Sequence, residues 1–99
     1  MPKRELHNNL VPAVPTHPGE VLKEELDARG ISQTQLAETI GRPIQTVNMI
    51  IKGRKGISAE TAIDLENAFP EIPADFWLQS DMRYRLNVER LQRQERKAG

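Results

Sequence analysis

Two amide side chains and a group of cations lie close together in the middle of the chain. The amides belong to Gln45 and Asn48. The cations that follow them are Lys52, Arg54 and Lys55. An amide can bond the N6 and N7 atoms of adenine in a bidentate way, and cations attract phosphate oxygens. The segment therefore predicts a surface that contacts nucleic acid, with Gln45 as the best candidate for a base contact. Asn48 could read a base in the same way or bond a phosphate.

The other reactive residue types do not form a catalytic pattern. The chain has no cysteine, and its two histidines, His7 and His17, have no acidic partner at the spacing of metal ligands. Ser32 and Ser58 stand where helix caps are expected, and no glycine-rich phosphate loop is present. We therefore predict no enzymatic activity, no cofactor and no metal site. His17 precedes a proline and is interpreted as a helix-entry residue.

The composition is typical of one small globular domain. The 99 residues include 14 cations and 14 acids, so the formal net charge is zero. No apolar run approaches the ~18 residues that a membrane span needs. The first residues lack the apolar core of a signal peptide, so we expect a cytoplasmic location. A neutral total is not what a nucleic-acid binder usually shows, because such domains are commonly basic.

The neutral total hides four blocks of alternating charge. Residues 20–28 carry a net charge of −3, 39–59 carry +4, 60–81 carry −6 and 82–99 carry +4. Such blocks indicate separate faces and separate partners, although each one could also be a solvated helix face. The first basic block coincides with the two amides and the cations that follow them.

Hydrophobic spacing predicts an all-α fold of five short helices. The start and stop signals of the first four are Pro18, Gly30, Ser32, Gly41, Pro43 and Ser58. Ser32 and Gln35 form a capping-box pattern, and Pro43 fits the first position of the third helix. The fifth helix contains residues 76–86, and charged sequence continues beyond it. The predicted organisation is an irregular or disordered arm at 1–16, a domain at 17–86 and a charged C-terminal extension at 87–99.

The second and third helices carry the most specific pattern. Two helices that cross at a tight turn need a small residue in the first, a glycine at the turn and branched apolar residues on the inner face of the second. Ala37, Gly41, Val47 and Ile50 fill these positions. An ordinary helical hairpin could use the same chemistry, so the pattern favours a helix-turn-helix without requiring one.

Residues 33–52 resemble the helix-turn-helix of the phage-repressor-like (XRE) family of DNA-binding proteins. The resemblance is closer to the HigA-type antitoxins of toxin–antitoxin operons, which have three further motifs. These are the His-Pro-Gly-Glu opening at 17–20, the Gly-Arg-Lys-Gly-Ile-Ser turn at 53–58 and the Phe-Trp-Leu segment at 76–78. Together they cover residues 17–86.

The resemblance implies roles for individual side chains. Gln33, at the start of the second helix, would bond a phosphate. The other implied phosphate contacts are Arg42, Thr46, Lys52, Arg54 and Lys55. Ile44 and Met49 could meet a thymine methyl group or simply pack. Pro43 stands where the family often has a Ser or Thr cap, and the exposed face is more apolar than usual, which leaves room for recognition of DNA shape.

The resemblance also implies two partners, namely double-stranded operator DNA and a small basic HigB-type toxin that cleaves mRNA. The acidic stretches at 20–27 and 60–81 offer surfaces for a basic protein, or may equally be solvated faces. The fifth helix has more large apolar residues than one face can bury, which favours a homodimer. The residues expected at that interface are Trp77, Met82, Tyr84 and Leu86. Alternatively, Trp77 completes the core of the monomer.

Two other functions remain open from the sequence. One is a solitary XRE-type transcriptional regulator without a toxin, which the neighbouring reading frame would distinguish from an antitoxin. The other is a helix-turn-helix module that binds proteins and no longer contacts DNA, for which the apolar Ile44 and Met49 would be the argument.

Overall fold

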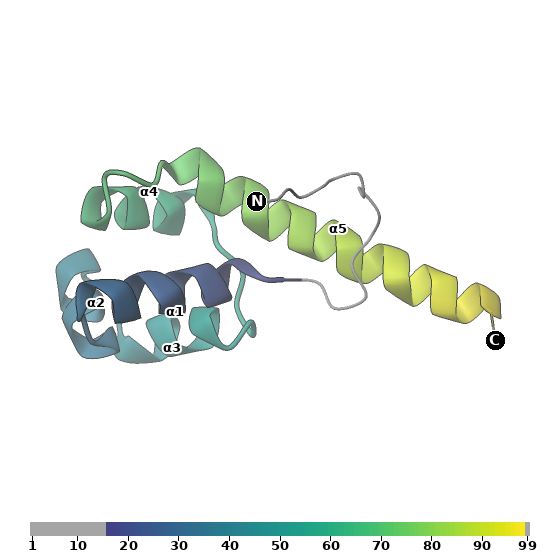
Figure 1. Ribbon diagram of the computed structural model, residues 1–99, viewed down its shortest axis with the longest axis horizontal. Coiled ribbons are helices and arrows are strands. Elements are labelled where there is room, and N and C mark those ends of the chain that lie inside the picture. Colours follow the sequence, from purple (N-terminus) through teal and green to yellow (C-terminus); the bar gives the residue numbers. More distant parts are fainter. Residues whose placement is uncertain (1–15, 99) are drawn as a thin grey trace.

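The computed structural model describes residues 16–98 and contains five helices in that range (Figure 1). They are α1 (Pro18–Arg29), α2 (Gln33–Ile40), α3 (Ile44–Ile51), α4 (Ala59–Ala68) and α5 (Ala74–Ala98). The described residues include no strand, so the predicted all-α class is confirmed. The predicted N-terminal arm falls outside the described residues except for its last position.

The helix ends follow the predicted signals. The Ser32 hydroxyl accepts a hydrogen bond from the backbone N–H of Gln35, whose side chain in turn accepts one from the Ser32 N–H. Gly30 and Gly41 end α1 and α2 in the left-handed conformation, with φ of 66° and 68°. That conformation suits glycine because it has no Cβ. Pro43 differs slightly from the prediction, because it is the N-cap of α3 and not its first helical residue.

One small core joins all five helices. Its largest fully buried side chain belongs to Trp77, with Phe69 next. The other core residues are Leu22, Leu26, Leu36, Ala37, Val47, Ile50, Ile57, Ala62, Leu65 and Ala74. The interface role predicted for Trp77 is therefore wrong, since its side chain is 0% exposed and completes the core of the monomer.

Helix α5 is much longer than the other helices. Its first turns pack against α4 and α1, and its C-terminal half extends away from the other four helices (Figure 1). Ion pairs at i,i+4 spacing stabilise the helix, Asp81–Arg85 near the turn after α3 and Glu89–Arg93 in the extended half. The helix passes the predicted domain boundary at residue 86 without a break. Among the described helices none combines the length and apolarity needed to cross a bilayer.

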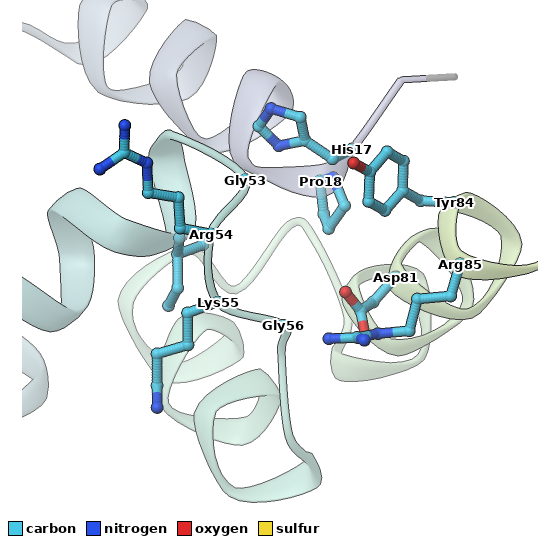
Figure 2. Close-up of a pocket in the computed structure, with 10 residues that line it drawn as sticks. His17, Pro18, Gly53, Arg54, Lys55, Gly56, Asp81, Tyr84 and Arg85 are labelled. Atoms are coloured by element: carbon cyan, nitrogen blue, oxygen red, sulfur yellow. The ribbon is translucent and has the colours of Figure 1, made fainter. Parts of the chain in front are cut away.

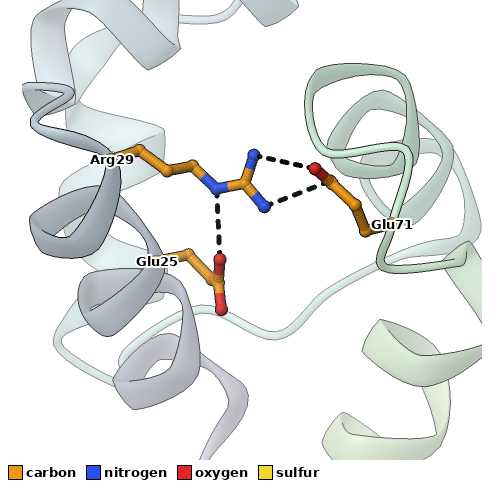
Figure 3. Close-up of polar contacts among 3 residues, drawn as sticks. All are labelled: Glu25, Arg29 and Glu71. Carbon is orange, nitrogen blue, oxygen red and sulfur yellow. Dashed lines mark hydrogen bonds and ion pairs between the residues drawn. The ribbon is translucent and has the colours of Figure 1, made fainter.

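Arg29 ties the end of α1 to the loop between α4 and α5 (Figure 3). Its guanidinium donates to Glu25 at 3.1 Å and to Glu71 at 3.1 and 3.5 Å, and it lies 4.5 Å from the centre of the Phe69 ring. The hydrogen bond to Glu71 raises the pKa of Arg29. The pKa of Glu71 is lowered first by a hydrogen bond from its own backbone and second by the hydrogen bond from Arg29. This contact closes the end of the core that lies opposite the start of α1.

The start of α1 approaches the end of α3 very closely. Pro18 and Gly19 are buried there, and a Cβ added to Gly19 would overlap the backbone carbonyl oxygen of Ile50. Glycine is needed at this position because backbone, and not a flexible side chain, occupies the space. The contact holds the C-terminal end of α3 against the rest of the domain.

We expect Gly19→Ala to lower the free energy of unfolding by about 1–3 kcal/mol, the usual cost of overpacking. Alanine is the better helix former by about 1 kcal/mol, so a purely local effect would have the opposite sign. Urea unfolding followed by circular dichroism measures the change. Glu24→Ala, on the exposed face of the same helix, is the control and should stay within about 0.5 kcal/mol of the native value. A Gly19→Ala protein as stable as the native one would contradict the close approach.

Candidate nucleic-acid interface

The helix-turn-helix predicted from four spaced residues is present. Ala37 is buried between α2 and α3, and Gly41 makes the turn with a φ of 68°. Val47 and Ile50, on the inner face of α3, are 0% and 2% exposed. Because this face is held against α1 and α2, the opposite face of α3 must point to solvent.

That outer face forms a shallow depression between the starts of α2 and α3. It has a volume of about 340 Å³ and is lined by Gln33, Ile44, Gln45, Asn48 and Met49. All five were predicted from the sequence to face DNA. The tertiary structure brings them together, and their contact with DNA stays a prediction.

Two of the three amides that line the depression are hydrogen-bonded to each other. The Asn48 Nδ2 atom donates a hydrogen bond to the Gln33 Oε1 atom at 3.2 Å. Gln45 has no side-chain hydrogen bond with any described residue, and its side chain is exposed. One amide pair is therefore fixed in orientation, and the third amide keeps its full donor and acceptor capacity for a ligand.

Arg42 lies apart from this group, between α2 and α4. Its guanidinium contacts the Asp64 carboxylate at 2.7 and 2.8 Å and Glu60 at 3.5 Å. The hydrogen bond to Asp64 raises the pKa of Arg42, so the side chain stays charged and paired. The phosphate contact predicted for Arg42 would compete with this ion pair. The charge that Arg42 contributes to the basic block is therefore largely neutralised within the fold.

The remaining cations of the block lie at the end of α3 and in the turn after it. Lys52, Arg54 and Lys55 are exposed, and none has an ion pair with another described residue. Gly53 turns the chain with a φ of 75°. Figure 2 shows the side chains of Arg54 and Lys55 directed away from α5. Three unpaired cations thus stand at one end of the outer face of α3.

Of the other predicted contacts, Pro43 is exposed and Thr46 is half-buried. The carbonyl of Pro43 accepts a hydrogen bond from the backbone N–H of Thr46 at 3.0 Å, which closes the first turn of α3. Pro43 offers no capping side chain, so the N–H groups at the start of α3 are not covered by a side-chain acceptor. Both residues lie at the N-terminal end of α3, and their contact with DNA stays a prediction.

Sequence reasoning did not find the cluster that joins α1, the turn after α3 and α5. The His17 Nδ1 atom accepts a hydrogen bond from the Gly19 N–H at 3.1 Å, which confirms the helix-entry interpretation. The ring of His17 meets Tyr84 edge to face at 5.6 Å, and Gly53 lies against its other side (Figure 2). Two motifs in the sequence mark His17 and Gly53, but only the fold shows that they touch and that Tyr84 covers them.

The predicted interface residues of α5 fall into three different environments. Trp77 is in the core, and Tyr84 is half-buried against His17. Met82 and Leu86 are 57% and 45% exposed and line, with Leu78, a groove of about 480 Å³ on the outer face of α5. The apolar stripe available to a partner is therefore the one at 78, 82 and 86, and not the one through Trp77 and Tyr84.

Within residues 16–98, no group of three or more His, Asp or Glu side chains is placed to hold a metal ion.

Comparison with known proteins agrees with this geometry. The profile of the helix-turn-helix family matches residues 22–77. Virulence-associated protein A of Dichelobacter nodosus is 38% identical over 74 residues, which span 74% of this chain and 72% of that protein.

Two solved structures have the same fold and related sequences. An addiction module antidote protein of the HigA family from Coxiella burnetii is 34% identical, with a TM-score of 0.74 over 84% of this chain and 89% of that one. The Pseudomonas aeruginosa antitoxin HigA, solved with the higBA promoter, is 35% identical, with a TM-score of 0.76 over 83% and 89%. The identity and coverage together show common descent, so this chain belongs to the XRE-type helix-turn-helix family, in its HigA antitoxin branch.

Proposed function

We propose that the protein is an antitoxin that binds operator DNA through α3, represses its own operon and neutralises a HigB-type toxin. The observation that carries the DNA-binding part is the outer face of α3. There the exposed amide of Gln45 and two half-buried amides lie on the same face as three cations that have no ion pair with a described residue. A relative of the same fold was solved with promoter DNA, which supports the same use of this face. The role places the protein in the cytoplasm, and it requires no catalytic group.

The two kinds of side chain would do different work on the duplex. A major groove admits one α-helix, whose N-terminal residues reach the base edges. Gln45 is the second residue of α3 and carries an unengaged amide, so it is the base contact. Lys52 and Arg54, at the other end of α3, would pair with phosphates and fix the position of the helix without reading sequence.

Gln45→Ala should cost about 1–3 kcal/mol of binding free energy on the specific site, because the bidentate amide contact is lost. The loss should be much smaller on a scrambled duplex of the same length. Fluorescence-anisotropy titrations with the DNA upstream of the gene, at low and high salt, measure both. Equal affinities of Gln45→Ala and native protein on the specific site would remove Gln45 from the base-reading set.

Lys52→Ala is the matched control for that experiment. It removes a phosphate contact, so it should weaken binding to both duplexes alike. The slope of log K against log salt concentration should become shallower by about one. A protein that binds no duplex at any salt concentration would instead support the protein-interaction alternative.

We also propose that two copies associate through the groove on α5. Leu78, Met82 and Leu86 recur every four residues, so they form one continuous exposed stripe on the helix. Two such stripes related by a two-fold axis would bury each other, which is the commonest form of homodimer. A dimer would also present two α3 helices to two half-sites about one helical turn apart.

Met82→Asp should shift the protein from dimer to monomer, because a charge would be buried in an apolar contact. Sedimentation equilibrium at micromolar concentration measures this change. Ile63→Asp is the control, since Ile63 is 53% exposed on α4, outside the groove, and should leave the assembly unchanged. Native protein that sediments as a monomer at these concentrations would refute the proposed interface.

The toxin would bind to acidic positions that the fold leaves unpaired. Most of the acids at 60–81 are engaged, as in the pairs Asp64–Arg42 and Asp81–Arg85. Glu24, on α1, and Asp75, at the start of α5, are exposed and have no ion pair with a described residue. These two positions, and not the full −6 of that block, are therefore the acidic groups that we expect a small basic protein to contact.

A small basic product encoded beside this gene should co-purify with the protein and lose its mRNA-cleaving activity in the complex. The double variant Glu24→Lys, Asp75→Lys should weaken that complex, since both changes repel a basic partner. Glu95→Lys, far along α5, makes one such charge reversal away from both positions and should have no effect. A neighbouring product that neither binds nor is inhibited would leave the solitary regulator as the function.

A further inference from the structure

The depression on the outer face of α3 has two apolar side chains among its polar ones. Ile44 and Met49 are each 41% exposed, whereas Val47 and Ile50 on the inner face are fully buried. Ile44 is the first residue of α3 and Met49 the sixth, so both stand on the part of the helix that would enter the groove. These two side chains are not needed for the core of the monomer.

The base edges of DNA offer little that such side chains can bind. In the major groove, the edges of adenine, guanine and cytosine present hydrogen-bond donors and acceptors, and the one apolar group is the C5-methyl of thymine. Placing Ile44 or Met49 against a polar edge would desolvate that edge without replacing its hydrogen bonds. A thymine methyl is therefore the ligand group that this depression can bind with a gain in free energy.

The polar side chains of the depression further limit which bases it can contact. The Gln33 and Asn48 amides are bonded to each other, so the amide without a partner in the described structure is that of Gln45. No acidic residue lines the depression, so it lacks the carboxylate that commonly accepts the hydrogen bond from the amino group of cytosine. The lining thus combines an adenine-reading amide with a methyl-binding surface.

We propose that this depression recognises thymine through its C5-methyl group, with Ile44 and Met49 as the residues that determine specificity. Each operator half-site then contains a thymine whose methyl lies between these two side chains, next to an adenine read by Gln45. This assignment rests on the proposed DNA-binding function. It adds the chemical feature of the base that the protein detects.

Deoxyuridine tests the proposal, because it pairs like thymidine and lacks only the methyl group. A site is first selected with the full-length protein from a library of random duplexes about 30 base pairs long, enough for two half-sites. Each thymidine of the selected duplex is then replaced in turn by deoxyuridine, and the dissociation constants are measured. Native protein should bind about three- to fivefold more weakly for each methyl group that α3 contacts.

The variants assign the effect to the two side chains. In Ile44→Ala and Met49→Ala the ratio of the affinities for thymidine and deoxyuridine duplexes should fall towards one. Ile63→Ala, at an exposed apolar residue of α4, should keep the native ratio. Circular dichroism checks that all three variants are folded. Binding that is equal on thymidine and deoxyuridine duplexes would overturn the proposal and leave DNA binding intact. A methyl effect that persists in both α3 variants would assign it to other residues. Failure to select any duplex would overturn the proposed function itself, and this inference with it.

Discussion

The burial of one face of α3 is the constraint on which the rest of the structure depends. A helix of eight residues is too short to be stable alone, so α3 exists because Val47 and Ile50 are packed against α1 and α2. Gly19 allows the backbone of α1 to approach the end of α3, and Gly41 sets the direction in which α3 leaves α2. With the inner face fixed, the orientation of the outer face is fixed as well, so its amides and apolar side chains share one side of the domain.

Electrostatic pairing within the fold explains how a neutral protein can present a cationic surface. Arg42 is neutralised by Asp64, and Arg29 by Glu71 and Glu25, so these charges connect helices and add little to the external field. Three cations, Lys52, Arg54 and Lys55, have no such pairing with a described residue and lie beside the outer face of α3. Pairing therefore removes charge from both the acidic and the basic blocks and leaves a positive surface where a phosphate backbone would lie.

Helix α5 combines a structural role with an exposed apolar surface. Trp77 anchors its start in the core, and Tyr84 holds its middle against His17. The stripe of Met82 and its neighbours is left on the far side. The His17–Tyr84 contact thus connects α5 to the start of α1, on a different side of the helix from the proposed dimer groove.

The sequence by itself determined the five helices, their caps and the helix-turn-helix, because these depend on local spacing and on glycine, proline and serine at the ends of helices. It also identified the five residues that line the α3 depression. Helical spacing places the four residues of α3 on one face, and the family resemblance added Gln33 at the start of α2. Only the tertiary structure decided which charged and apolar side chains remain available to a binding partner. Arg42 is paired with an acid 22 positions away, and Trp77 is covered by helices distant in sequence. Contacts between residues far apart in the chain leave no local pattern. The phosphate contact that the resemblance implied for Arg42 therefore did not anticipate its ion pair, and spacing left Trp77 open between an interface and the core.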